Sequence, residues 1–130
     1  MSLRLIDPRD KFLLKRDVIS TQAVLGHLRS VLRSFAMKEG HSQFYIGITR
    51  HVERRCDQHR VKNPWAQWMC PVFEEAVPHV LAGSFDALER DAIREFRRGI
   101  IHPETNKVLL SCRNGPSGSQ PKTCLYVLVG

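Results

Sequence analysis

The chain has 130 residues, which is the length of one domain and enough to bury a hydrophobic core without disulfides or metal ions. Its 20 Lys and Arg against 13 Asp and Glu give a formal net charge of +7, which favours a polyanionic partner such as nucleic acid. No apolar run is long enough to span a bilayer and the first residues lack a signal-peptide core, so we expect an intracellular protein that does not enter the membrane. Its four cysteines are then expected to be free thiols.

The first third of the chain predicts two helices. Residues 7–16 predict a short one, because an aspartate able to cap is followed by proline at the first helical position. From Thr21 to Phe35 the apolar residues recur at steps of three and four, the period of an amphipathic helix. The end of this helix stays open, because residues 33–37 can equally form a strand paired with residues 43–48.

The most informative stretch runs from Gln43 to His59. β-favouring residues around Tyr45 predict a strand, and the charged segment after it predicts a helix. Arg55 and His59 are one helical turn apart, so the guanidinium and the imidazole lie on one face, near the Tyr45 phenol. A guanidinium can clamp a phosphate and a phenol or imidazole can move a proton, which suits phosphodiester chemistry. The alternative is an ordinary half-buried strand residue above a solvated helix face.

The rest of the chain predicts two further helices and up to three strands. By residue range these are a short helix (63–71), a short strand (79–81), a longer helix (85–98) and two strands (108–110 and 125–129). Pro71 is expected to end the first helix and Gly99 the second. The polar loop over 113–121 is long enough to face a ligand.

Glu89 lies at an unusual position for a charged residue on the longer predicted helix. It borders the apolar stripe instead of occupying the wet face. One explanation is a capping box, in which Asp86 caps the helix and Glu89 reaches back to the Asp86 amide. The other is a functional carboxylate.

Taken together, these pieces resemble the GIY-YIG nuclease domain, a small α+β fold that cuts DNA. Residues Tyr45–Gly47 stand where the second signature of that family stands. Arg55 and His59 are similar to its Arg-x-x-x-His helix. Glu89 resembles the metal-binding glutamate of the family, and Asn114 resembles the asparagine near the end of the domain.

The resemblance implies a single α+β domain over residues 1–130, with a small antiparallel sheet of about three strands flanked by helices. Residues 31–130 would form the GIY-YIG-like core and residues 1–30 a helical extension. The implied activity is a divalent-metal-dependent DNA endonuclease that hydrolyses phosphodiester bonds. Glu89 would hold one Mg²⁺ or Mn²⁺ ion. Arg55 would bind the scissile phosphate, and a tyrosine would take the proton from water with help from His59.

Further residues are expected to bind the nucleic acid. They are Arg50, Arg54, Arg60, Lys62 and Asn114. If no bond is cut, the same basic residues predict a catalytically impaired binding module that holds the phosphate backbone. A structural protein with an acidic partner is the third possibility, and it would leave Glu89 as a helix cap.

This chain differs from the family at the first signature. The family has a Gly-Ile-Tyr-like strand some ten residues before Tyr45, where this chain has Phe35 and its neighbours, without a hydroxyl. The only other tyrosine is Tyr126. Either Tyr45 acts alone as the base, tuned by His59, or Tyr126 enters from the last strand, or the domain has lost cleavage and kept binding.

Overall fold

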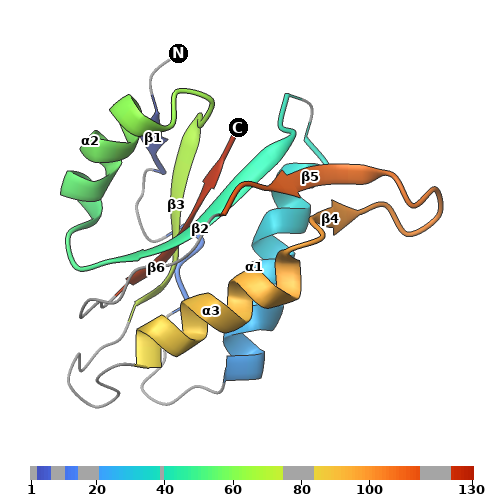
Figure 1. Ribbon diagram of the computed structural model, residues 1–130, viewed down its shortest axis with the longest axis horizontal. Helices are drawn as coiled ribbons and strands as arrows, with labels where there is room; N and C mark the ends of the chain where they lie inside the picture. Colours follow the sequence, from blue (N-terminus) through green and yellow to red (C-terminus); the bar gives the residue numbers. More distant parts are fainter. Residues whose placement is uncertain (1–2, 7–10, 15–20, 39, 75–83, 115–123) are drawn as a thin grey trace.

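The computed structural model of the chain describes residues 3–6, 11–14, 21–38, 40–74, 84–114 and 124–130 (Figure 1). In chain order the elements are β1 (Arg4–Leu5), α1 (Thr21–Ala36), β2 (Gln43–Thr49), α2 (Val52–Lys62), β3 (Trp68–Glu74), α3 (Ser84–Phe96), β4 (Ile100–Ile101), β5 (Val108–Cys112) and β6 (Cys124–Val129). Among these helices, none combines the length and the hydrophobicity that crossing a lipid bilayer requires.

The strands form one mixed sheet of six strands in the order β1-β3-β6-β2-β5-β4. β6 pairs antiparallel with both β2 and β3, and β4 pairs antiparallel with β5. The pairs β1/β3 and β2/β5 are parallel. The fold is therefore α+β as expected, but the prediction of a small antiparallel sheet of about three strands was wrong. Parallel pairs need long connections, and helices α1, α2 and α3 lie within them.

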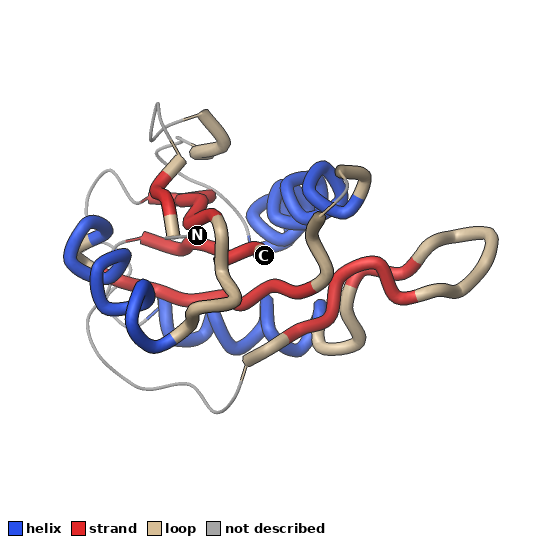
Figure 2. The backbone as a smooth tube through the Cα atoms, turned by 90° about the horizontal axis from the view of Figure 1, so that it is seen from above, coloured by secondary structure: helices blue, strands red, loops and turns tan. Residues whose placement is uncertain are grey.

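Helices cover both faces of the sheet (Figures 1 and 2). Successive side chains of a strand point to opposite faces, so β2 and β6 each contribute to two hydrophobic clusters. The larger cluster joins the sheet to α1 and α3, and the smaller one joins it to α2 and β1. The β4–β5 hairpin extends beyond the helices at one end of the molecule (Figure 2).

β6 lies inside the sheet, between β3 and β2, and is apolar on both faces. All six of its residues, Cys124–Val129, are buried. A strand without alternating polar residues has to be covered on both faces, and β6 contributes side chains to the hydrophobic clusters on both. The prediction of a strand at 125–129 is confirmed, and the strand beside β2 is this one.

The amphipathic helix expected from Thr21 is α1, and it continues to Ala36. The alternative, a strand over residues 33–37 paired with β2, was wrong. Phe35 is buried on the helix and packs against Phe12, with 5.8 Å between ring centres. The apolar period of three and four residues thus holds to the last turn. The boundary proposed between an extension and a core at residue 30 falls inside this helix.

The helix expected over 63–71 was also wrong. Trp68–Glu74 is the strand β3, and it passes through Pro71. The pairing register with β6 shifts between Pro71 and Phe73, so proline stands at an irregularity where the ladder tolerates a missing N–H.

The short helix expected over 7–16 is not formed in its described part. Lys11 and Phe12 lie in a turn, and Leu14 makes a parallel bridge to Phe73. The strand expected at 79–81 and most of the 113–121 loop lie outside the described residues. The helix expected over 85–98 is confirmed as α3, with Gly99 beyond it at a φ of 86°, and the strand expected at 108–110 is β5.

Candidate active site

Two tyrosines from neighbouring strands lie on the α2 side of the sheet. β2 supplies Tyr45 and β6 supplies Tyr126, whose partner across the ladder is Gly47. The Tyr126 ring lies directly over Gly47. A Cβ atom at position 47 would be 2.4 Å from the Tyr126 hydroxyl oxygen. Glycine at this position is therefore what leaves room for the ring.

Helix α2 brings Arg55 and His59 to the same place. Nε2 of His59 is 2.6 Å from the Tyr126 hydroxyl oxygen, and Nε of Arg55 donates to that oxygen at 3.4 Å. The His59 ring also contacts Tyr45, with 5.4 Å between ring centres. We call Tyr45, Arg55, His59 and Tyr126 the phenol cluster. The predicted convergence of a phenol, a guanidinium and an imidazole is found in the structure, with a second phenol added.

Two further side chains hold the cluster, Gln58 within α2 and Asn63 just after its last residue. Arg55 donates through Nη1 to Gln58 Oε1 at 2.8 Å. His59 Nδ1 is 2.7 Å from Nδ2 of Asn63. Both side chains are partly buried, so the cluster is fixed before any ligand arrives.

Burial decides the protonation of the cluster. Burial and the positive charges of Arg55 and Lys62 lower the pKa of His59 to about 4, so the imidazole is neutral at pH 7. Burial raises the pKa of both tyrosines, and the hydrogen bonds and charge of Arg55 oppose this rise. Tyr126 is 0% exposed, whereas Tyr45 is only partly buried. Of the two tyrosines, only Tyr45 can meet a water molecule or a substrate directly.

Glu89 on α3 is the carboxylate closest in effect to the phenols. It is 5% exposed, and its negative charge contributes to the raised pKa of Tyr45 and of Tyr126. α3 begins at Ser84, so Asp86 is the third helical residue and does not stand ahead of the helix as a cap. Glu89 itself lies in the second turn of α3, and its charge acts on both phenols of the cluster.

Some of the residues predicted to bind nucleic acid are exposed, and others form contacts within the protein. Arg50, Arg54 and Lys62 are exposed. Lys62 follows Arg55 by seven residues, so both lie on one face of α2. Arg60 points to the other flank, where Nε donates to the Leu3 carbonyl at 2.9 Å and the guanidinium pairs with Asp57. Arg60 thus ties α2 to the start of β1.

The side-chain amide of Asn114 forms two hydrogen bonds with the backbone of β2. Its Oδ1 accepts from the Ile46 N–H at 2.8 Å, and its Nδ2 donates to the Ile46 carbonyl at 2.6 Å. Both polar ends of the amide are used in this way. The side chain continues the β5 ladder, so Asn114 holds β2 in place instead of pointing into open solvent.

No multidentate metal site accompanies these residues. Among the side chains that the structure describes, no three His, Cys, Asp or Glu gather as a metal site. All four cysteines are free, as expected.

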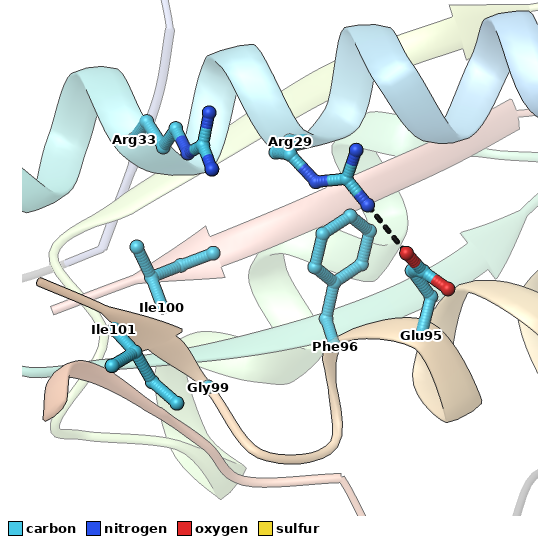
Figure 3. A pocket seen from close by; sticks show the side chains of 7 residues that line it. All are labelled: Arg29, Arg33, Glu95, Phe96, Gly99, Ile100 and Ile101. Atoms are coloured by element: carbon cyan, nitrogen blue, oxygen red, sulfur yellow. Dashed lines mark hydrogen bonds and ion pairs between the residues drawn. The ribbon is translucent and has the colours of Figure 1, made fainter. Parts of the chain in front are cut away.

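A separate hollow of about 180 Å³ lies between α1 and the end of α3 (Figure 3). The Arg29 guanidinium pairs with Glu95 above the Phe96 ring, and Arg33 projects from α1 toward Ile100. None of the predicted site residues lines this hollow. It is distinct from the phenol cluster.

Comparisons with protein-family models, curated proteins and solved structures find no match for this chain.

Sequence reasoning left the role of Tyr126 open and did not single out Asn63. The signal for Tyr126 was its rarity, as one of two tyrosines in the chain. Asn63 had a spacing signal, because it follows His59 by four residues just as His59 follows Arg55. Such spacing places all three on one face of α2.

Proposed function

We propose that the protein is a divalent-metal-dependent DNA endonuclease of the GIY-YIG type that hydrolyses phosphodiester bonds at the phenol cluster. The observation that carries the proposal is the meeting of Tyr45, Arg55, His59 and Tyr126 at one place. The negative charge of Glu89 contributes to the raised pKa of both phenols. A solvated helix face does not bury a histidine against two tyrosines.

The position of β6 supports the resemblance on the point where the sequence departs from it. The first-signature tyrosine is absent ahead of β2, and the strand beside β2 carries Tyr126 from the end of the chain. The chain would then present the two tyrosine strands of the family in reversed order. The geometry of the site depends on which strands are neighbours in the sheet. It does not depend on the order of these strands along the chain.

The roles follow from exposure and charge. Tyr45 is the partly exposed phenol and takes the proton from the attacking water. Arg55 has donors left after its bonds to Tyr126 and Gln58, and it binds the scissile phosphate. Tyr126 and His59 are buried and hold Arg55 and Tyr45 in position. Arg50, Arg54 and Lys62 bind the flanking phosphates.

Glu89 fits the requirement for a hard oxygen ligand. Magnesium keeps several waters and needs only one or two carboxylates when the substrate supplies phosphate oxygens, so a single glutamate is sufficient. When bound there, the ion would stabilise charge on the leaving oxygen. Burial is the main cause of the raised pKa of Tyr45, and the negative charge of Glu89 is the second. A cation that neutralises the Glu89 charge therefore favours loss of the Tyr45 proton.

The test is cleavage of supercoiled plasmid by the purified full chain in magnesium buffer. We expect nicked or linear product from wild type, and a rate lower by ~10²–10³ for Glu89→Gln and for Tyr45→Phe, the typical cost of losing one electrostatic or proton-transfer group. Glu95→Gln is the matched control, since Glu95 lies on the same helix but faces Arg29. Its rate should equal that of wild type.

Equal rates for Glu89→Gln and Glu95→Gln would overturn the role of Glu89. Salt-dependent DNA binding without product at any magnesium or manganese concentration would identify a binding module instead.

A further inference from the structure

We infer that Asn63 is a positioning residue that sets the tautomer of His59, and so the direction of the hydrogen bond between His59 and Tyr126. Its importance for cleavage rests on the proposed function. The tautomer itself is a property of the protein without DNA and can be observed independently.

Asn63 is fixed where α2 ends. Its backbone N–H donates to the His59 carbonyl at 2.8 Å, so the residue is held one turn beyond the histidine. Its side-chain nitrogen Nδ2 is 2.7 Å from His59 Nδ1. An amide nitrogen only donates, so Nδ1 of the ring must accept.

A neutral imidazole that accepts at Nδ1 carries its proton on Nε2. The ring is buried, and burial together with the charge of Arg55 keeps it neutral at pH 7. The proton on Nε2 then points at the Tyr126 oxygen, 2.6 Å away. His59 is therefore a hydrogen-bond donor to Tyr126.

Two donors thus converge on one phenol oxygen. His59 Nε2 and Arg55 Nε both donate to Tyr126, at 2.6 and 3.4 Å. The two acceptor sites of the hydroxyl are then filled, and its own proton points away from both partners. With the opposite tautomer, Tyr126 would donate its own proton to a bare Nε2, while its oxygen would still accept from Arg55. Asn63 excludes this arrangement, so the Tyr126 proton stays directed away from His59.

The tautomer can be read from the ring nitrogen chemical shifts of the full chain, labelled with ¹⁵N-histidine, with His59 assigned through His59→Gln. At pH 7 we expect Nδ1 unprotonated and Nε2 protonated. In Asn63→Asp the new carboxylate can only accept a hydrogen bond, so Nδ1 should carry the proton and donate it to the carboxylate. Asn106→Asp makes the same chemical change at an exposed position of the β4–β5 hairpin and should leave the His59 signals unchanged.

A wild-type ring protonated on Nδ1 would overturn the inference, and so would Asn63→Asp with Nδ1 still unprotonated. The wild-type measurement stands if the variant does not fold. For cleavage we expect Asn63→Asp to lower the nicking rate about 10–100-fold, the range for groups that orient a site histidine. Absence of cleavage in wild type with the expected tautomer would refute the proposed function and leave the role of Asn63 intact.

Discussion

At the scale of single residues, the contact between Gly47 and Tyr126 is the most restrictive in the candidate site. A strand residue with any side chain at position 47 would collide with the phenol ring, at 2.4 Å from both Cζ and the hydroxyl oxygen. The glycine at position 47 therefore has a steric reason in this chain. It allows a buried tyrosine on the next strand to reach Arg55 and His59.

We predict that Gly47→Ala destabilises the protein by about 1–3 kcal/mol, the usual cost of overpacking a filled interior. The added methyl group has to displace the Tyr126 ring, which is 0% exposed and surrounded by neighbours. Urea unfolding followed by circular dichroism measures the change.

The matched control is Gly26→Ala. Gly26 is exposed within α1, and a Cβ there meets nothing within 4 Å. Alanine at this helical position should stabilise the protein by about 0.5–1 kcal/mol. If Gly47→Ala were as stable as Gly26→Ala, the Tyr126 ring could not lie over position 47.

At the scale of elements, β2 is held on both sides by different means. On one side β6 pairs with it over six residues, from Phe44 to Thr49. On the other side β5 pairs only with Gln43 and Phe44, and the Asn114 side chain then takes over at Ile46. An amide side chain thus replaces one peptide group of a strand at the point where the β5 backbone has left the sheet.

We predict that Asn114→Ala costs about 1–3 kcal/mol, because the N–H and carbonyl of Ile46 lose their partner at a position that is 0% exposed. Hydrogen exchange of the Ile46 amide should accelerate more than that of amides in β3. Ser111→Ala on the same strand changes an exposed side chain and should stay within about 0.5 kcal/mol of wild type. Unchanged exchange at Ile46 would show that Asn114 does not bond β2.

At the scale of the whole molecule, the stability is linked to pH through His59. The folded pKa is about 4 against an ordinary value of 6.5, because the ring is buried beside Arg55. Between these values the unfolded chain binds a proton at His59 and the folded chain does not. Stability therefore falls as the pH is lowered from 6.5 toward 4.

We predict that acidification from pH 7 to pH 4 lowers the free energy of unfolding through His59 by about 3 kcal/mol, which corresponds to the shift between the two pKa values. His59→Gln removes this titration but keeps a polar side chain. Urea unfolding of both proteins at several pH values isolates the contribution as the difference between two curves. Parallel curves between pH 7 and pH 4 would contradict the prediction.

The sequence by itself determined those local elements whose apolar period is regular. Repeats of three and four apolar residues predicted α1 and α3, and apolar runs predicted the strands at Tyr45 and Tyr126. The four-residue spacing of Arg55 and His59 placed them on one face of α2. These features depend on the helical and strand periods of neighbouring residues, so they can be read without the rest of the chain.

Only the tertiary structure decided which segments meet. The six-stranded mixed sheet and the strand character of Trp68–Glu74 depend on contacts between distant residues, which local patterns do not encode. The partner of β2 is β6, a strand that is buried along its whole length between β3 and β2. That single choice brings Tyr126 to Arg55 and His59, and it supplies the second phenol that the sequence lacks ahead of Tyr45.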